Sequence, residues 1–309
     1  MAGLIALTGA TGFIGQHLLR ELPKYGYRLR ALLRRPTDVP IDAASAVIGD
    51  IVRPRNMAAA LEEVDAVIHS AGLAHVMSGA PADDYRVLNT EATINLAQAA
   101  QRAGVRRFIF LSSIRAQCGH SAEGVVSEEQ TPRPTSPYGE SKLAAEQGLQ
   151  GLDLDWVALR PVLVYGPGVK GNMAALLRLA RSPYPLPLGA LGNRRSLLAL
   201  DNLVAAIDAV LAAPGSLRRP LIVADREALT VPEMIAALRR GLSRKPGLVP
   251  APPALLRLLM RLAGRNDIMA RLGGDLVVDV SALAALGWKP VITTQEGLER
   301  LARETPAGK

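Results

Sequence analysis

The 309-residue chain has little cysteine, few aromatic side chains and no long apolar run. Its single cysteine, Cys118, excludes an intramolecular disulfide and fits a reducing compartment, so we expect a cytoplasmic protein. No stretch of about 18 uninterrupted apolar residues predicts a membrane span. The best candidate, residues 254–263, is short and contains Arg257 and Arg261, which is typical of an amphipathic helix over a core. The first apolar run is too short for a signal peptide and lacks a basic leader.

Aromatic residues make up only 4% of the chain, whereas the formal net charge is +8. The Lys and Arg side chains are spread along the sequence without interleaved aromatics, which argues against a nucleic-acid partner. We interpret the charge as a solvated basic surface, which would also suit a small substrate that carries a diphosphate. We expect no metal site.

The most informative stretch that is present is LIALTGATGFIG at residues 4–15. A short apolar run predicts a buried strand, and an apolar helical pattern follows the glycines. A strand, a glycine turn and a helix start together indicate a dinucleotide site. Gly9 would allow the tight turn, Gly12 the approach of a pyrophosphate, and Gly15 close packing of the helix on the strand. Because the spacing is G-x-x-G-x-x-G, a plain turn between strand and helix stays an alternative.

Apolar strands and helical patterns alternate along the first half of the chain. Strands are expected at 27–33, 45–48, 65–69 and 107–112, and helices at 13–22 and 83–102. The alternation predicts a Rossmann-type doubly wound parallel sheet, that is, an α/β fold with helices on both faces. A sixth strand is expected from Trp156 to a glycine–proline turn at 166–168. Beyond it the chain contains many more prolines. We therefore predict a nucleotide-binding domain over 1–165 and a smaller α/β substrate-binding domain over 166–309. As an alternative, part of 192–226 returns to the first domain.

The residues after the second strand bear on the choice of cofactor. Arg34 and Arg35 stand where a site that prefers NAD would carry an acidic residue. Guanidinium groups there suit a 2′-phosphate, so we favour NADP(H), with NAD(H) as the alternative. An exposed arginine pair is the simpler interpretation of the same residues. Asp50, after the third strand, either accepts a hydrogen bond from an adenine amino group or caps the next turn.

Catalytic chemistry is predicted near Tyr138 and Lys142, which begin a helical pattern that continues to Leu149. Residues four apart lie on one helix face, so Lys142 would favour the phenolate of Tyr138 and lower its pKa from about 10 toward neutrality. Lys142 would also hold a nicotinamide ribose. Ser113, at the end of the fifth strand, either orients a substrate oxygen or caps the strand.

Together these residues resemble the extended short-chain dehydrogenase/reductase family, which includes nucleotide-sugar epimerases, dehydratases and 4-ketoreductases. The pieces that carry the resemblance are TGATGFIG at 8–15, GDI at 49–51, HSAG at 69–72, NTEAT at 89–93, FLSS at 110–113, YGESK at 138–142 and LRPVLVYGPG at 159–168. Three more pieces are similar to a bacterial subgroup of UDP-N-acetylhexosamine 4-epimerase-like proteins and reductases of UDP-4-keto-6-deoxy-N-acetylhexosamines. They are AGLAHVM at 71–77, GNRRSLLALDNL at 192–203 and LGWKP at 286–290.

The resemblance implies a role for particular residues. Tyr138 would be the acid/base, Lys142 its modulator and ribose ligand, and Ser113 the group that bonds the sugar C4 oxygen. The cofactor-binding positions would be Gly9, Thr11, Gly12, Phe13, Ile14, Gly15, Arg34, Asp50, Ile51, Ser70, Ala71, Gly72, Asn89, Tyr138, Lys142, Pro161 and Val164. The substrate-binding positions would be His75, Ser113, Asn172 and Arg195, of which Asn172 and Arg195 would face the nucleotide diphosphate.

The chain departs from the family pattern at three places. AQCG at 116–119 replaces V-Y-G after the serine with one extra residue, which leaves open the sugar and the choice between Ser113 and Ser112. Ala92 replaces a glycine. Arg34 replaces the acid of epimerases that retain NAD, which favours a reductase.

The resemblance predicts an NAD(P)-dependent nucleotide-sugar oxidoreductase that acts at sugar C4 by hydride transfer. It would be either a UDP-glucose/UDP-N-acetylhexosamine 4-epimerase or a UDP-4-ketosugar reductase. The alternatives are a non-catalytic dinucleotide-binding protein of the same fold and a reductase of a non-sugar carbonyl. Family members often dimerise through two helices, here those near 83–102 and 137–150, so a homodimer is expected by analogy.

Overall fold

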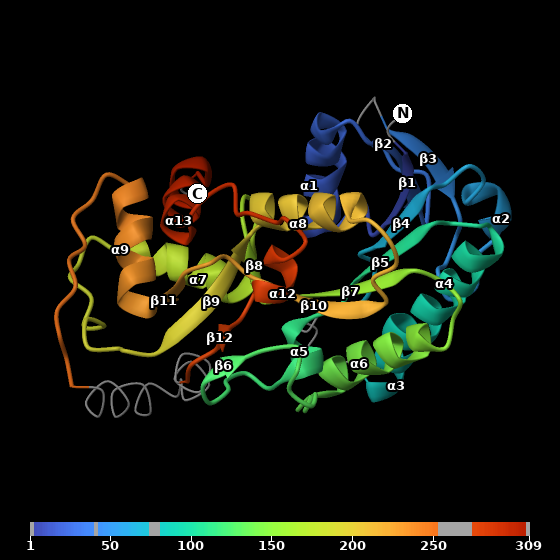
Figure 1. Cartoon of the computed structure of the whole chain (residues 1–309). Helices are drawn as coiled ribbons and strands as arrows, with labels where there is room; N and C mark the ends of the chain where they lie inside the picture. Colours follow the sequence, from blue (N-terminus) through green and yellow to red (C-terminus); the bar gives the residue numbers. More distant parts are fainter. Residues whose placement is uncertain (1–2, 40–42, 74–80, 253–273, 307–309) are drawn as a thin grey trace.

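The computed structural model describes residues 3–39, 43–73, 81–252 and 274–306. Its centre is a seven-stranded parallel sheet in the order β10-β7-β5-β4-β1-β2-β3 (Figure 1). The strands of this sheet are β1 (Leu4–Thr8), β2 (Arg28–Leu33), β3 (Ala44–Val47), β4 (Ala66–His69), β5 (Arg107–Leu111), β7 (Trp156–Pro161) and β10 (Arg219–Val223). The predicted Rossmann-type parallel sheet is confirmed.

The central strands are apolar along their whole length because both faces of the sheet are covered. Every residue of β1, β5 and β7 is buried. Successive side chains point to opposite faces, so Ile5 and Leu7 join one apolar cluster while Leu4 and Ala6 join the other. Burial on both faces therefore fixes this register.

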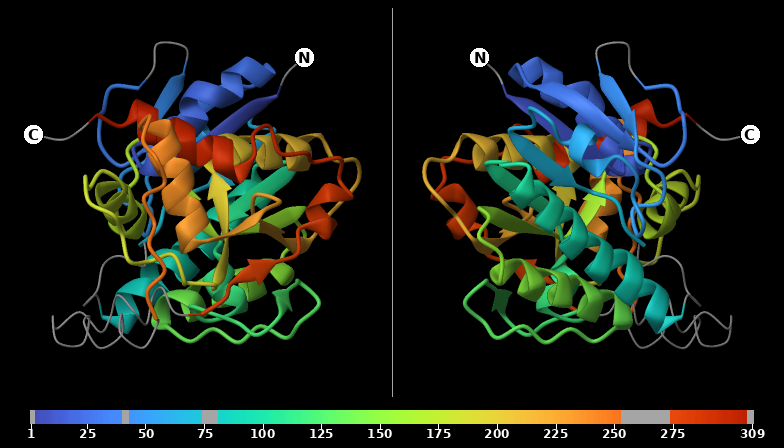
Figure 2. Two further views of the ribbon diagram at one scale, coloured as in Figure 1. Left: turned by 90° about the vertical axis from the view of Figure 1, so that its left-hand side faces the viewer. Right: turned by 90° about the vertical axis from the view of Figure 1, so that its right-hand side faces the viewer.

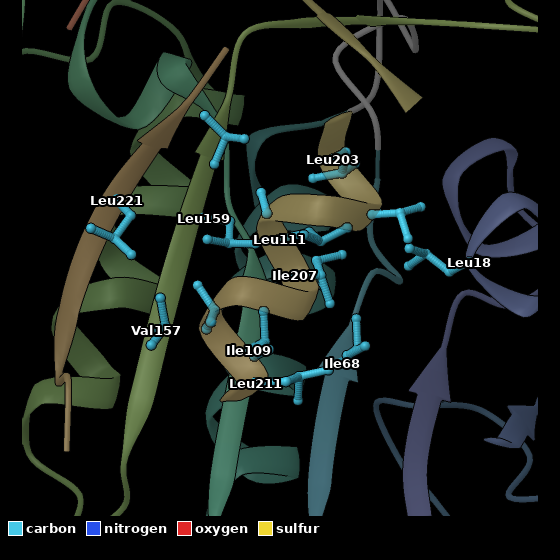
Figure 3. Close-up of a cluster of buried hydrophobic side chains, with 14 of the residues drawn as sticks. Leu18, Ile68, Ile109, Leu111, Val157, Leu159, Leu203, Ile207, Leu211 and Leu221 are labelled. Carbon is cyan, nitrogen blue, oxygen red and sulfur yellow. The ribbon is translucent and has the colours of Figure 1, made fainter. Parts of the chain in front are cut away.

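Helices cover each face of the sheet. One face carries α1 (Phe13–Glu21) and α8 (Leu200–Ala212), and the other carries α2 (Met57–Ala60), α4 (Ala92–Arg102) and α6 (Pro137–Gln150). Figure 3 shows the first face, where Ile207 of α8 lies over the strands near Ile109, and Leu18 of α1 lies at the edge of the same apolar cluster. The other face is visible in Figure 2, where α4 and α6 run side by side.

A smaller unit lies beyond the carboxyl ends of the large sheet. Its three-stranded mixed sheet has the order β11-β9-β8 and is surrounded by helices α7, α9 and α13 (Figure 2, left). These elements are β8 (Leu163–Tyr165), β9 (Arg194–Ala199), β11 (Ala228–Thr230), α7 (Gly171–Ala180), α9 (Val231–Gly241) and α13 (Thr294–Glu304). A two-stranded sheet and short helices complete the described chain: β6 (Val125–Val126), β12 (Val277–Val278), η1 (Leu22–Tyr25), α3 (Ala82–Tyr85), η2 (Arg86–Glu91), α5 (Ile114–Gln117) and α12 (Ser281–Ala284). Thus both smaller sheets are built from short strands.

The sixth strand is shorter than predicted, because the chain changes sheets at Val162. Strand β7 ends at Pro161, and β8 pairs with β9 in the smaller sheet. Proline has no N–H with which to extend a ladder, so it suits the end of a strand. Later in the chain, β10 returns to the edge of the large sheet beside β7.

The predicted helix at 83–102 is also divided. It consists of α3, the π-helical segment η2 and α4. A π-helical turn shifts the side chains that follow it around the helix axis, and such turns are frequent at functional sites. None of the described helices is both long and apolar enough to cross a membrane.

Candidate active site

The glycine turn after β1 has a backbone that other residues would not fit. Gly9 has a φ of +69°, in the left-handed region that favours glycine. The Gly12 N–H donates to the Gly9 carbonyl at 2.9 Å and closes the turn. A Cβ on Gly15 would lie 2.1 Å from the same carbonyl oxygen, so α1 packs this closely only with glycine there. The first turn of α1, which contains Phe13 and Ile14, therefore lies at the carboxyl end of β1, where its free N–H groups suit an anion.

The loop after β4 closes on this turn at the point where the strand order reverses, between β1 and β4. Ligands of open α/β sheets bind at such a point. Ser70 Oγ donates to the Thr8 carbonyl at 2.7 Å, and the Ala71 N–H donates to Thr8 Oγ1 at 3.3 Å. A Cβ on Gly72 would lie 2.7 Å from Asn89 Oδ1. The small residues predicted here thus lie directly beside the glycine turn.

His69, a buried residue to which the sequence analysis gave no role, connects this region to α4. His69 Nδ1 lies 2.7 Å from Thr8 Oγ1, and Nε2 lies 2.9 Å from Thr93 Oγ1. Thr93 Oγ1 donates to the Asn89 carbonyl at 2.7 Å, so it accepts from the Nε2–H of His69. Burial, and then the positive charge of Lys142, lower the His69 pKa to about 3. The neutral ring therefore serves as a fixed donor and acceptor, and the HSAG piece was its only signal in the sequence.

Asn89 lies in η2 and is fully buried. Its Nδ2 donates to the Leu73 carbonyl at 3.2 Å and to Ser141 Oγ at 3.1 Å. Its Oδ1 accepts from the Leu73 N–H at 2.8 Å. The Asn89 side chain thus connects the loop after β4 to helix α6.

Ser113 and Tyr138 meet at the carboxyl end of β5. Helix α6 begins after Ser136, whose Oγ accepts the Gly139 N–H at 3.2 Å. Ser113 caps α5, because its Oγ accepts the Arg115 N–H at 3.2 Å. The Ser113 side chain also hydrogen-bonds Tyr138, which lies in the first turn of α6. The Tyr138 phenol and the Ser113 hydroxyl therefore share one corner of the fold.

Ser112, the alternative serine, does not take this position. Its hydroxyl donates to the buried Glu146 carboxylate instead. The structure therefore brings Ser113, rather than Ser112, to the hydroxyl of Tyr138.

The sequence predicts that Lys142 lowers the pKa of Tyr138, but in the structure the Tyr138 pKa is raised. Burial is the largest influence, and it raises the pKa of Tyr138. The Ser113 hydrogen bond and the positive charge of Arg115 oppose it, whereas Tyr85 raises the pKa further. Sequence reasoning missed Arg115, because only folding of α5 against α6 brings its charge close to Tyr138.

Lys142 lies one turn further along α6 and is buried. Its Nζ donates to the Leu111 carbonyl at 2.9 Å and lies 4.6 Å from the centre of the Phe110 ring. Burial lowers the Lys142 pKa to about 8, and the Glu146 carboxylate opposes this shift. A Cβ on Gly72 would lie 3.5 Å from Nζ, so the ammonium group faces the loop after β4.

The residues predicted to bind the part of the dinucleotide away from Tyr138 are more exposed to solvent. Arg34 is exposed just beyond β2, and Thr11 is exposed in the glycine turn. Asp50 Oδ1 accepts the Val52 N–H at 3.0 Å, which is the turn-capping role considered as its alternative. Asp50 also lines an open cavity of about 340 Å³, whose other walls are Val52, Arg53, Asp83, Asp84, Val87 and Leu88. Ile51 is half-buried beside it.

The remaining predicted positions belong to the border with the smaller unit. Pro161 ends β7 and is buried, and Val164 lies in β8. Arg195 reaches from β9 toward the chain after α5, where it donates to the His120 carbonyl at 2.8 Å. Asn172, in the first turn of α7, is exposed and makes no side-chain hydrogen bond with the described residues. The structure thus connects Arg195 to the chain after α5 and shows no such contact for Asn172.

Two of the sequence predictions lie outside the described residues: His75 and the amphipathic helix at 254–263. In the part of the chain that is described, no group of three His, Cys, Asp or Glu side chains has an arrangement that could hold a metal ion.

A parallel doubly wound sheet with a glycine turn at its switch point, and a Ser–Tyr–Lys set nearby, defines the class of Rossmann-fold dinucleotide-binding proteins. Residues 5–223 match the NAD dependent epimerase/dehydratase family. The chain belongs to this family, which is the extended short-chain dehydrogenase/reductase family. The resemblance noted in the sequence is thereby confirmed.

Individual relatives cover nearly the whole chain. It is 36% identical over 310 residues to a UDP-glucose 4-epimerase of Vibrio cholerae, covering 97% of this chain and 94% of the relative. A ceramide reductase of Caulobacter vibrioides is 29% identical over 259 residues, 82% of this chain and 75% of the relative. The solved structure of MoeE5 in complex with UDP-glucuronic acid and NAD has a TM-score of 0.74 and 28% identity, and 97% of this chain and 98% of that chain are covered. The family is thus shared by proteins with sugar and non-sugar substrates.

Proposed function

We propose that the protein is an NAD(P)-dependent oxidoreductase that acts at C4 of a UDP-hexose or UDP-N-acetylhexosamine, as a 4-epimerase or a 4-ketoreductase. The observation that carries the proposal is the Ser113–Tyr138 hydrogen bond, with Lys142 one turn away, beside the glycine turn. The 36% identity with a UDP-glucose 4-epimerase over nearly the full length supports a nucleotide-sugar substrate.

The residues of the site fit a dinucleotide. At Gly9 and Gly15 the turn leaves no room for a side chain, so the backbone would bring the start of α1 close to a pyrophosphate. Lys142 would hold the nicotinamide ribose, facing the loop at Gly72. The bound nicotinamide would supply the hydride chemistry at the sugar carbon.

Tyr138 would move the proton that accompanies this chemistry. When the sugar C4 hydroxyl is oxidised, its proton passes to the Tyr138 phenolate while C4 loses a hydride; reduction returns both. The Ser113 hydroxyl would bond the same sugar oxygen and keep it in reach of Tyr138. Arg195, on the far side of the corner, would face the diphosphate of the substrate, as would Asn172.

NADP(H) and NAD(H) are the two candidate cofactors, and a first experiment distinguishes between them. The exposed Arg34 favours NADP(H), whereas the MoeE5 complex contains NAD. We would denature the purified protein, identify any released nucleotide by absorbance and mass, and measure melting temperatures with NADPH and NADH. Stoichiometric NAD would indicate a 4-epimerase that retains its cofactor, and stabilisation by NADPH alone would indicate a 4-ketoreductase. If no nucleotide is bound and neither one raises the melting temperature, the proposal is wrong.

The substrate is tested separately. UDP-glucose and UDP-N-acetylglucosamine should each be examined for epimerisation, and UDP-4-ketosugars for reduction. The ceramide reductase relative makes a non-sugar carbonyl the second candidate, and it would be favoured if no UDP-sugar raises the melting temperature. A homodimer through α4 and α6 stays a prediction, which gel filtration checks.

A further inference from the structure

A closed cluster of four buried polar side chains lies directly behind the proposed catalytic corner. Glu146, Arg160, Gln117 and Ser112 are each at most 4% exposed. Arg160 Nε donates to the two Glu146 carboxylate oxygens at 3.1 and 3.2 Å, and a second Arg160 nitrogen donates to Glu146 at 2.5 Å. The Ser112 hydroxyl also donates to Glu146, and Arg160 also donates to the Gln117 side-chain carbonyl. Glu146 and Arg160 therefore satisfy most of each other's hydrogen-bonding capacity and bind two neighbours.

This cluster connects every element that carries a proposed catalytic residue. Ser112 directly precedes Ser113 at the end of β5, and Gln117 ends α5, the short helix that Ser113 caps. Glu146 follows Lys142 by one turn on α6. Arg160 extends from β7, the strand beside β5. A shift of the Glu146 carboxylate would therefore be felt at both Ser113 and Lys142.

Stability alone does not explain an ion pair in this place. Moving two charges out of water is costly, and well-packed apolar side chains of similar volume stabilise a core as well or better. The sheet around the cluster is otherwise filled by apolar residues such as Phe110 and Ala158. We infer that Glu146 is a positioning residue, whose buried ion pair with Arg160 holds Ser113 and Lys142 in their working arrangement. The inference rests on the proposed function of that corner.

Lys142 is where the charge of Glu146 would be felt most directly. The charged and titratable groups that act on the Lys142 ammonium are His69 on β4 and Glu146 on its own helix, with Arg160 behind Glu146. His69 is neutral, so Glu146 is the carboxylate that keeps the Lys142 ammonium charged against burial. Without the Glu146 charge, Lys142 would lose its proton at lower pH.

The first test observes Lys142 without using substrate or cofactor. The chain has only six lysines, so ¹³C-lysine NMR of the full protein can resolve each titration. In Glu146→Gln, the Lys142 signal should titrate at lower pH than in the wild type. The control is Glu140→Gln, an exposed carboxylate on the same helix, which should leave the Lys142 titration unchanged. Equal titration of Lys142 in the wild type and Glu146→Gln overturns the inference.

A second variant guards against misfolding, since Glu146→Gln leaves the buried Arg160 without its ion partner. Glu146→Leu/Arg160→Met removes both charges together and should fold with near-normal stability. If the pair positions the corner, this folded double variant should lose about 100-fold in kcat with a much smaller change in KM, because small misplacements of reacting groups have effects of that size. Wild-type kcat in the folded double variant overturns the inference. If instead the wild type acts on no UDP-sugar, the proposed function fails, while the NMR result still decides the role of Glu146.

Discussion

At the amino end of the large sheet, Arg107 begins β5 with its guanidinium fully buried. It donates to Asp155 at 2.7 Å and to the carbonyls of Ala213 and Gly215 at 2.9 and 2.5 Å. At the other end of the same strand, Ser113 caps α5, and Lys142 Nζ donates to the Leu111 carbonyl at 2.9 Å and faces Gly72 in the loop after β4.

The difference between the two ends follows from the direction of parallel strands. At the amino end, the Arg107 guanidinium and the Asp155 carboxylate are bound by protein partners and close loops such as the one after α8. At the carboxyl end, where Ser113 and Lys142 lie, is the crevice in which ligands of open α/β sheets bind. Buried polar groups thus secure the fold at one end and carry the proposed chemistry at the other.

The largest effect is expected from Tyr138→Phe. Loss of the phenolic hydroxyl removes the proposed proton carrier, so kcat should fall by about 10²–10⁴-fold. The melting temperature should change little, because the ring is retained. Tyr184→Phe, at a site that is 73% exposed, is the control and should keep full activity. Wild-type kcat in Tyr138→Phe would instead support a non-catalytic dinucleotide-binding protein.

Arg107→Met tests the amino end. It removes the ion partner of Asp155 and the donor to several carbonyls, so the free energy of unfolding should fall by about 3–5 kcal/mol, the usual effect of breaking a buried pair. The measurement is chemical denaturation, with the neighbouring exposed Arg106→Met as control. Kinetic constants of the folded fraction should stay those of the wild type. An altered pH profile of activity would contradict the division between the two ends.

Ser113→Ala should act on activity and on its pH dependence. The Ser113 hydrogen bond lowers the pKa of Tyr138, so its loss should raise that pKa. In the oxidative direction Tyr138 works as the phenolate, and the rising limb of the rate should therefore move to higher pH. We expect kcat to fall by about 10²-fold, as for loss of one hydrogen-bond donor at a reacting oxygen. Ser113→Thr retains the hydroxyl, so the rising limb of its pH–rate profile should lie where it does in the wild type. An unshifted rising limb in Ser113→Ala would exclude a role of Ser113 in lowering the Tyr138 pKa.

The smallest effect is expected at Asp225, which follows β10 at the carboxyl end of the large sheet. Like Arg107 at the amino end, its side chain is hydrogen-bonded by protein partners. It accepts from Tyr165 Oη at 3.0 Å, from the Ala199 N–H at 3.0 Å and from Asn202 Nδ2 at 2.7 Å. Burial raises its pKa to about 6. The folded state therefore binds a proton more tightly than the unfolded chain, and wild-type stability gains as pH falls from about 6 to about 4.

The asparagine side chain in Asp225→Asn does not titrate, so the gain in stability at lower pH should disappear in this variant. Melting temperatures of the wild type and Asp225→Asn should diverge as the pH is lowered over that range, with the wild type rising relative to the variant. Activity should be little changed at neutral pH. Parallel curves for the two proteins would show that Asp225 does not titrate in the folded state.

Much of the nucleotide-binding half was predictable from local patterns. The apolar run and glycines of residues 4–15 specify a strand, a turn and a helix start, since the backbone at Gly9 and Gly15 excludes other residues. The spacing of Tyr138 and Lys142 places them on one helix face for a similarly local reason. The exit at Val162 was missed because an apolar run does not reveal which sheet it joins.

The amino-acid sequence by itself determined the alternation of strands and helices, the glycine turn and the Tyr138–Lys142 pair, because these depend on residues within a few turns of one another. Only the tertiary structure decided that Ser113 rather than Ser112 meets Tyr138, and that burial and Arg115 set the Tyr138 pKa. It also decided that Glu146 of α6 pairs with Arg160 of β7, the next strand along the chain. These contacts join side chains from different elements, and their geometry exists only once the sheet has closed between its helices.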